Sequence, residues 1–143
     1  MRERNLAAAA VLFALALPVA GQDLLDASQA FRTSARRIGA DVIEVRYDTA
    51  PGYYLYRDRL EFKLQPESAR LGAPKLPPGK VKEDEFFGRS VIYRNRTIVQ
   101  LPITAMDNST VTLTADLQGC ADIGVCYPPV RRTFVLAAPS KAR

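Results

Sequence analysis

The chain of 143 residues carries 20 Lys and Arg against 15 Asp and Glu, for a formal charge of +5, and it contains two cysteines and no histidine. Without histidine, a Ser-His-acid triad, a Cys-His nucleophile and the usual zinc sites are excluded, and any metal site would need carboxylates to complete its shell. Basic residues are interspersed with acidic ones, which argues against a nucleic-acid surface. We therefore expect one domain with a single core, no metal site and no nucleic-acid partner.

Residues 1–21 have the pattern of a secretory signal peptide. Two arginines precede an apolar run from Leu6 to Leu17, and Pro18 ends this run just before small residues. The run is too short to cross a bilayer stably, so we expect the segment to be removed on export. Residues 22–143 would then form one domain in an oxidising compartment, where a disulfide is permitted.

The segments that follow are dominated by strand patterns. Asp26–Arg37 predicts only a short helix or an ordered lead-in, because its apolar stripe is weak. Downstream, apolar residues recur with a period of two or form short runs, which predicts strands at 41–48, 59–64, 98–103, 110–117 and 132–136. Turn-forming residues separate them at 49–52, 65–68, 76–79 and 107–109. About seven short strands with almost no helix predict an all-β fold, an immunoglobulin-like antiparallel β-sandwich of one domain.

Both cysteines lie in the stretch GCADIGVCYPP at residues 119–129. Cys120 and Cys126 follow a predicted strand and enclose only five residues, so they are expected at the strand end or in the loop beyond it. Closing such a ring contributes roughly 2.4 kcal/mol, against about 4.7 for a ring of a hundred residues, so the bridge would be a weak staple. A small ring in a loop is also within reach of a partner's thiolate. The residues alone leave a structural and a redox-active disulfide open.

A second stretch, EDEFFG at residues 83–88, places three acids before two aromatic residues and a glycine. This composition is poor for a strand and favours a mobile loop with an apolar tip. The alternative is a solvated turn whose aromatic rings pack into the core.

A third stretch, GYYLYR at residues 52–57, is rich in tyrosine. In a strand, Tyr54 and Tyr56 would lie on one face, and Tyr53 and Leu55 on the other. One pair can therefore pack inward while the other lines a surface, although plain packing explains the tyrosines equally well.

These three stretches, together with Ile92-Tyr93-Arg94, resemble the family of N-terminal periplasmic domains of the thiol:disulfide interchange protein DsbD. The motifs occur in the family's order, the resemblance runs from about Asp41 to Val135, and the cysteine block is its most specific part. It implies an immunoglobulin-like domain in the periplasm with one catalytic cysteine pair. This pair would take electrons from the DsbD membrane domain and pass them to periplasmic oxidoreductases by thiol–disulfide exchange.

The resemblance also assigns roles to individual residues. Cys120 and Cys126 would be the catalytic pair, and Cys126 would form the mixed disulfide with partners. Phe86 would lie at the tip of a cap loop that shields the cysteines, and this loop comprises Asp84, Glu85, Phe86, Phe87 and Gly88. The surroundings of the pair would include Tyr54, Tyr56 and Tyr127. The implied activity is of the protein-disulfide reductase type, as one component of a larger DsbD-like system, and it needs no cofactor besides the redox-active disulfide.

The implied partners are thioredoxin-like periplasmic proteins of the disulfide isomerase and cytochrome c maturation types. DsbD-type membrane and C-terminal thioredoxin-like domains would lie on this or another chain, and the domain is expected to be a monomer. The chain departs from the family in stopping at Arg143 and in having Phe87 where tyrosine is frequent, which removes a hydroxyl group. The alternative function is a non-catalytic β-sandwich binding module with a structural disulfide.

The absence of histidine is consistent with a gated relay, that is, a cysteine pair that exchanges with a docked partner rather than with small oxidants. The acids of the cap stretch would raise the pKa of a nearby thiol by like-charge repulsion. Such a site should react slowly with small oxidants and depend on the partner's thiolate to attack.

Overall fold

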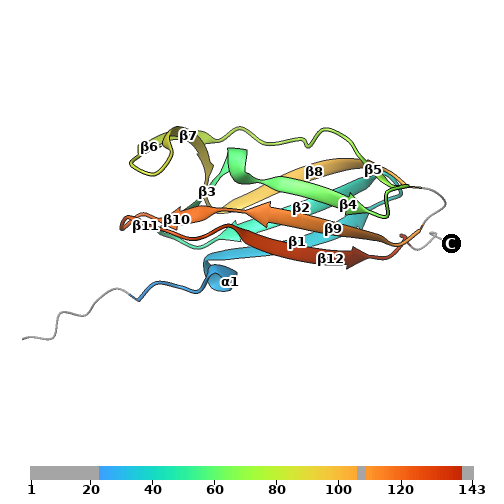
Figure 1. Cartoon of the computed structure of the whole chain (residues 1–143), viewed down its shortest axis with the longest axis horizontal. Helices are drawn as coiled ribbons and strands as arrows, with labels where there is room; N and C mark the ends of the chain where they lie inside the picture. Colours follow the sequence, from blue (N-terminus) through green and yellow to red (C-terminus); the bar gives the residue numbers. More distant parts are fainter. Residues whose placement is uncertain (1–22, 106–108, 140–143) are drawn as a thin grey trace, which may run out of the picture.

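The computed structural model describes residues 23–105 and 109–139. The predicted signal peptide therefore lies outside the described residues, as does most of the predicted turn at 107–109. Strands make up nearly all of the regular structure (Figure 1). Within the described ranges, no helix is long and apolar enough to span a membrane. The elements in chain order are α1 (Ala27–Ala30), β1 (Phe31–Ile38), β2 (Val42–Thr49), β3 (Tyr53–Tyr56), the 3-10 turn η1 (Arg57–Arg59), β4 (Glu61–Gln65), β5 (Arg70–Leu71), β6 (Lys80–Asp84), β7 (Gly88–Tyr93), β8 (Arg96–Thr104), β9 (Val111–Leu117), β10 (Gly119–Ala121), β11 (Val125–Cys126) and β12 (Val130–Leu136).

The strands form three antiparallel sheets. The body of the molecule consists of a sheet in the order β1-β2-β8-β5 and a second in the order β12-β9-β4. The third sheet has the order β11-β10-β3-β7-β6, and Figure 1 shows it at one end of the body, where β10 continues the direction of β9. The antiparallel β-sandwich predicted from the sequence is confirmed.

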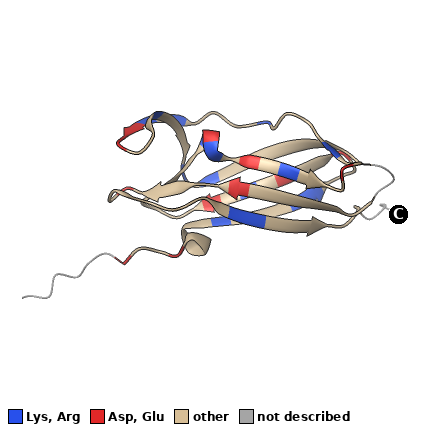
Figure 2. Ribbon diagram, in the orientation of Figure 1, with Lys and Arg blue, Asp and Glu red and all other residues tan. Residues whose placement is uncertain are grey.

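The core lies between the two body sheets, and alternation along each strand decides which side chains enter it. On β2, Ile43, Val45 and Tyr47 are fully buried, while the residues between them are only partly covered. The same alternation buries apolar residues of β8 and β9, because successive side chains of a strand point to opposite faces. Figure 2 shows charged residues spread over many of the strands, and none of the charged residues that the structure describes is fully buried. The strands predicted at 41–48, 98–103, 110–117 and 132–136 are thus confirmed within one to two residues at each end.

The N-terminal expectation was largely wrong. Only Ala27–Ala30 is helical, and the rest of the predicted lead-in is strand β1, which pairs with β2 along its whole length from Phe31↔Thr49 to Ile38↔Val42. The ring of Phe31 is completely buried. Pairing with an already well-patterned neighbour overrides the weak local preference, as is usual for strands.

The stretch at residues 83–88 is the turn end of a β-hairpin, so the predicted loop is limited to residues 85–87 and the residues on either side of it lie in strands. Glu83 and Asp84 end β6, Gly88 begins β7, and Asp84 is paired with Gly88 across the turn. Gly88 has a φ of +64°, a conformation that glycine adopts without the steric penalty of a Cβ. The residue pattern did not predict this hairpin because its strands do not alternate between apolar and polar residues.

Candidate active site

The two cysteines face each other in a small hairpin. Cys120 lies on β10 and Cys126 on β11, the two residues are directly opposed in the register, and a disulfide joins them. The tight turn between the strands places Gly124 at a φ of +97°. On its other side β10 pairs with β3, so that Cys120 is opposed to Tyr54. The structure therefore places the cysteines within two strands rather than in a loop beyond the sheet.

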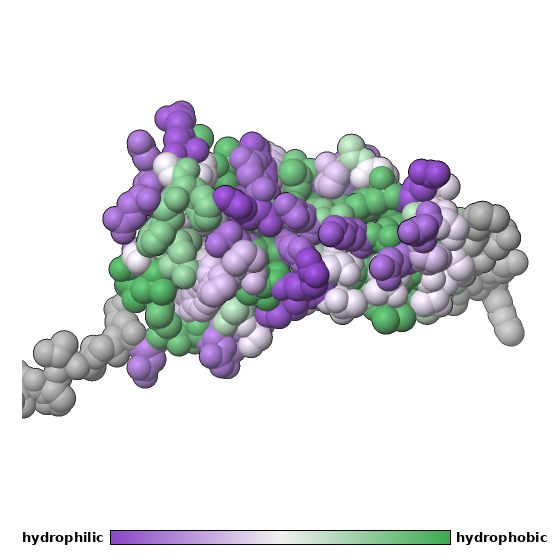
Figure 3. Space-filling view, in the orientation of Figure 1, coloured by the Kyte–Doolittle hydropathy of each residue, from purple (hydrophilic) through white to green (hydrophobic). Residues whose placement is uncertain are grey.

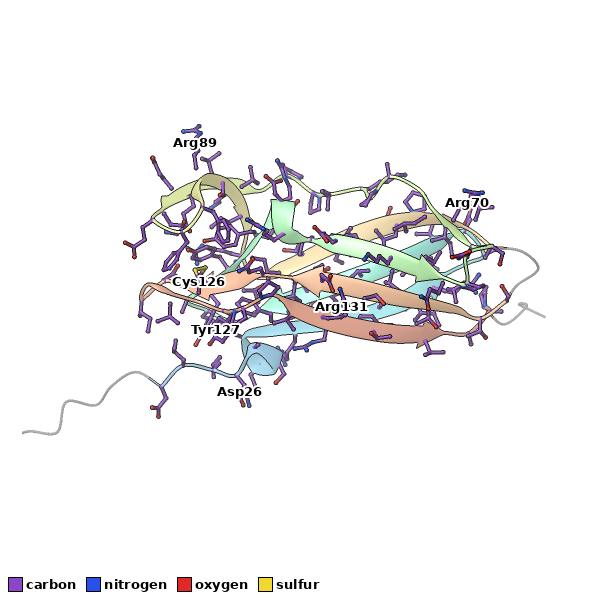
Figure 4. The ribbon with its side chains drawn as sticks, viewed as in Figure 1. Asp26, Arg70, Arg89, Cys126, Tyr127 and Arg131 are labelled. Carbon is purple, nitrogen blue, oxygen red and sulfur yellow. A yellow bond between two sulfur atoms is a disulfide. The ribbon has the colours of Figure 1, made fainter. Side chains whose placement is uncertain are left out.

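The two sulfur-bearing residues differ in burial. Cys120 is 0% exposed and belongs to a cluster with Tyr54, Tyr56 and Ile92, whereas Cys126 is only partly buried at the edge of this cluster. Figure 4 shows the disulfide between the cysteine hairpin and the β6–β7 hairpin. Because the rate of thiol–disulfide exchange depends on access to the attacked sulfur, the geometry favours attack at Cys126.

The hydroxyl group of Tyr56 lies beside both sulfurs. Its oxygen is 3.2 Å from Sγ of Cys120 and 3.8 Å from Sγ of Cys126. The sulfurs of a disulfide carry no hydrogen, and the hydroxyl donates its own hydrogen to Oδ2 of Asp84. The same carboxylate oxygen accepts a hydrogen bond of 2.8 Å from the hydroxyl of Tyr54. Both tyrosines are thus tied to the neighbouring hairpin.

Asp84 also fixes the turn of the β6–β7 hairpin. Its Oδ1 accepts hydrogen bonds from the backbone N–H groups of Phe86 (3.0 Å) and Phe87 (2.9 Å). Partial burial acts to raise the pKa of Asp84, but the hydrogen bonds from Phe87, Tyr56, Tyr54 and Phe86 outweigh it and hold the pKa below the ordinary 3.8. One ionised carboxylate therefore connects the turn to the tyrosines beside the disulfide.

The two tyrosines remain neutral hydrogen-bond donors at physiological pH. Burial is the main cause that raises the pKa of Tyr54 and of Tyr56 above 10.0, and the adjacent Asp84 raises both further. In the described part of the chain, no group of three or more His, Cys, Asp or Glu is placed to hold a metal ion. The chemistry that these residues can perform is that of the cysteine pair.

The aromatic residues of the cap hairpin take different positions. Phe87 packs on the buried cluster, with its ring centroid 4.7 Å from that of Tyr56 in an edge-to-face arrangement. Phe86 is 45% exposed at the turn, beside the exposed Glu85. The ring seated on the cluster is therefore Phe87, and the shielding of the cysteines by Phe86 stays a prediction.

Tyr127 supports the cysteine hairpin from the opposite side. Its ring packs edge-to-face on Phe31 at 5.4 Å and lies 6.2 Å from Tyr53, within the main core. Its hydroxyl donates to the carbonyl oxygen of Leu25, and its N–H donates to the carbonyl oxygen of Gly119. Tyr127 thus anchors the exit of the hairpin, whereas Tyr54 and Tyr56 are the tyrosines beside the sulfurs.

Comparison with known proteins identifies the family. The family model described as "Thiol:disulfide interchange protein DsbD, N-terminal" matches residues 21–138. The chain belongs to the DsbD N-terminal domain family. It is 41% identical over 114 residues to DsbD 1 of Pseudomonas aeruginosa and 42% identical over 122 residues to DsbD of Ralstonia nicotianae. The alignments cover 80% and 84% of this chain but only 19% and 20% of these relatives, so the chain spans about a fifth of their length.

Solved structures agree with this assignment. The DsbD N-terminal domain of Neisseria meningitidis in the reduced form is 36% identical and matches with a TM-score of 0.75 over 82% of this chain and 92% of that one. The same domain in a complex with the PilB N-terminal domain matches with a TM-score of 0.68 over 79% and 87%. These matches confirm the resemblance stated from the sequence motifs and the immunoglobulin-like form of the sandwich.

Two arginines at this end of the DsbD-type domain were missed as site residues. Arg94, present in the resemblance only as part of a motif, forms a two-pronged ion pair with Asp122 (3.0 and 2.8 Å) and donates to the carbonyl oxygen of Tyr53. It thereby ties the turn of the cysteine hairpin to β3. Arg59 lies over the ring of Phe87. Nothing in the local pattern around Arg59 signalled a contact with a residue 28 positions away.

Proposed function

We propose that this chain is a periplasmic thiol–disulfide exchange domain of the disulfide reductase type. It relays two electrons from a membrane reductant of the DsbD type to thioredoxin-like oxidoreductases through Cys120 and Cys126. The observation that carries the proposal is the disulfide at one end of the sandwich, in which one cysteine is fully buried and the other is accessible. The relatives are named for thiol:disulfide interchange, which supports the same chemistry.

The relay follows from the unequal access to the two sulfurs. In the reduced chain, the thiolate of Cys126 attacks the disulfide of the partner, forms a mixed disulfide and releases one partner thiolate. The thiolate of Cys120 then attacks Sγ of Cys126, which re-forms the disulfide seen here and releases the partner as a dithiol. Two electrons pass to the partner, and an upstream dithiol restores the reduced pair by the reverse sequence. No further cofactor is needed.

The surroundings of the pair restrain its reactivity. After reduction, the oxygen of Tyr56 is placed to accept a hydrogen bond from a thiol of the pair, and this stabilises the protonated form. The ionised Asp84, one hydroxyl group away, acts in the same direction by repelling a thiolate. Both effects raise the pKa of the thiols and limit reactions with small oxidants, while a docked partner supplies its own reactive sulfur.

The proposal also includes export of the chain, the bounds of the redox domain and its partners. Residues 1–21 act as the signal peptide for export to the periplasm, and residues 22–143 form the redox domain. Its partners are thioredoxin-like proteins of the disulfide isomerase and cytochrome c maturation types, together with DsbD-type membrane and C-terminal domains. One of the Neisseria structures is named as a complex of the DsbD domain with the PilB N-terminal domain, which supports a relay by direct docking.

The proposal is tested by trapping the mixed disulfide. A Cys120→Ser variant, which leaves Cys126 free, should capture an oxidised thioredoxin-like protein as a covalent complex on a non-reducing gel. The matched control is Cys126→Ser, whose remaining cysteine is fully buried and should capture little or none. If neither variant captures the partner under conditions that trap a known thiol reductant, the disulfide is structural and the relay is contradicted. Preferential capture by Cys120 would reverse the assigned roles.

A further inference from the structure

We propose that Arg59 is a positioning residue that keeps the β6–β7 hairpin seated beside the cysteine pair by clamping Phe87. Its part in exchange depends on the function proposed above, whereas the clamp itself does not. The carrying observation is that Cζ of Arg59 lies 4.2 Å from the centroid of the Phe87 ring. A guanidinium group at this distance from an aromatic face is attracted by the negative potential of the ring.

The clamp is connected to the disulfide by a short series of contacts. The ring of Phe87 contacts both the guanidinium group of Arg59 and the ring of Tyr56, whose centroid is 4.7 Å away. The hydroxyl oxygen of Tyr56 in turn lies within 3.8 Å of both sulfurs. Arg59 belongs to η1, which connects β3 to β4 in the body of the sandwich. It therefore links the hairpin to the segment through which the end sheet continues into β4 of the body.

The hairpin needs such side-chain attachments because little backbone pairing holds it. β7 pairs with β3 at only two positions, Leu55↔Tyr93 and Tyr56↔Ile92, both at the end of β7 that is far from the turn. The turn half of the hairpin extends beyond this pairing (Figure 1). Its side-chain attachments to the site include the hydrogen bonds of Asp84 and the packing of Phe87.

The chemistry of the Phe87 side chain explains why an arginine holds it. Phe87 has no hydroxyl group, so it cannot be held through a hydrogen bond of its own side chain. Its ring face can instead be held by a cation, which the guanidinium group of Arg59 supplies. Lys82 and Arg94 lie over the ring of Tyr54 at 5.2 and 5.3 Å, so cations contact two of the rings beside the disulfide.

The test measures how fast dithiothreitol reduces the disulfide of the oxidised chain. Samples are quenched with an alkylating agent at successive times, and mass spectrometry gives the fraction of reduced chains. Arg59→Gln should be reduced about two- to five-fold faster, as expected for the loss of an exposed cation–π contact. Arg59→Lys should fall between Arg59→Gln and the parent. The matched control is Arg89→Gln on β7, which removes the same charge beside the same surface hollow but leaves the contact between Arg59 and Phe87 intact, so it should not increase the rate.

The sign of the effect separates the clamp from simple electrostatics. The attacking thiolate is an anion, so removing a nearby positive charge by itself slows its approach. An increase for Arg59→Gln alone must therefore come from a hairpin that opens more often. A second variant, Phe87→Leu, should show an increase at least as large, since it also removes the ring contact with Tyr56. The double variant should be reduced little faster than Phe87→Leu, because Arg59 then has no aromatic ring to hold.

The clamp is overturned if Arg59→Gln is reduced no faster than Arg89→Gln, or if the Arg59→Gln and Phe87→Leu effects multiply independently. Thermal unfolding of each variant shows whether a faster rate merely reflects global destabilisation, and a loss of folding that accounts for the whole increase also overturns the clamp. Capture of a partner by Cys126 would be unaffected by these outcomes. A failure of the clamp is therefore distinguishable from a failure of the relay.

Discussion

Asp84 shows how much a single side chain contributes to this site. Its two carboxylate oxygens accept two hydroxyl hydrogen bonds and two backbone hydrogen bonds, and these connect the turn of one hairpin with the tyrosines beside the disulfide. The next residue, Glu85, is exposed. Both acids were expected near the cysteines, but the network that the structure shows contains only Asp84. A charge embedded in such a network has a pKa that reports directly on its partners.

Removal of the Tyr56 hydroxyl group should therefore raise the pKa of Asp84. In Tyr56→Phe one of the hydrogen bonds that lower this pKa is lost, so the pKa should move up toward 3.8. The measurement is an NMR titration of the Asp84 carboxyl carbon. Tyr93→Phe is the control, because its hydroxyl donates to the carbonyl oxygen of Pro77 instead. An Asp84 pKa that stays the same in Tyr56→Phe would contradict the network.

The direction of this shift also fixes the pH range in which the network stabilises the fold. A carboxyl group whose pKa is lowered by folding contributes stability above its unfolded pKa, and this contribution disappears as the pH falls through the folded pKa. For Asp84 the loss therefore begins near pH 3.8 and is complete at lower pH. At neutral pH the carboxylate is ionised and its hydrogen bonds to the turn and to the tyrosines are retained.

At the scale of elements, the cysteine hairpin depends on close approach to its neighbours. Gly119 precedes Cys120 on β10, where a Cβ would lie 2.6 Å from the ring of Phe31 and would collide with the carbonyl oxygen of Tyr54. On the other side of the hairpin, Arg94 holds Asp122 by an ion pair that is partly exposed. Such a pair contributes about 1 kcal/mol or less, so the packing at Gly119 is the stronger constraint on the hairpin.

Gly119→Ala should accordingly destabilise the chain. Its methyl group has no room without movement of β3 or of Phe31, so we expect the free energy of unfolding to fall by about 2 kcal/mol or more in urea titrations. Gly72→Ala is the milder control, since a Cβ there would lie 3.2 Å from Cβ of Pro102. Equal stabilities of the two variants would show that the region around Cys120 adapts more readily than its packing indicates.

At the scale of the whole molecule, the sandwich carries its chemistry at one end. The body sheets bury the main core, and the third sheet brings strands from well-separated parts of the sequence around the disulfide. Exposed apolar residues of this end include Leu24, Ile123 and Val125, and Figure 3 shows apolar surface there. A partly exposed disulfide at the end of the sandwich, beside apolar surface, is consistent with the relay proposed above.

A redox titration of the folded chain should distinguish this relay from a structural staple. Equilibration with thiol buffers of known potential, followed by alkylation, measures the fraction of reduced pairs. A relay requires a reduction potential above about −300 mV, whereas structural disulfides lie below it. A value well below this limit would contradict the relay and support the non-catalytic binding module.

The success of the sequence-based predictions depended on the range of the contacts involved. Alternation located most strands, such as β2 with Ile43, Val45 and Tyr47, because burial on one face leaves a local pattern. It failed for β1 and for the β6–β7 hairpin, whose pairing partners supply the order that their own residues do not specify. The motifs placed Tyr54, Tyr56 and Asp84 in one site, but they gave no role to Arg59.

The sequence by itself determined that the two cysteines lie close together, since five intervening residues hold them near each other in almost any fold. It also determined the strand periodicity and, through its motifs, the family. Only the tertiary structure decided that Cys120 is buried and Cys126 partly exposed, that Asp84 and Phe87 contact Tyr56, and that Arg59 lies over Phe87. The reason is physical: contacts between residues tens of positions apart depend on strand register and on how hairpins fold over one another, and no local pattern encodes these.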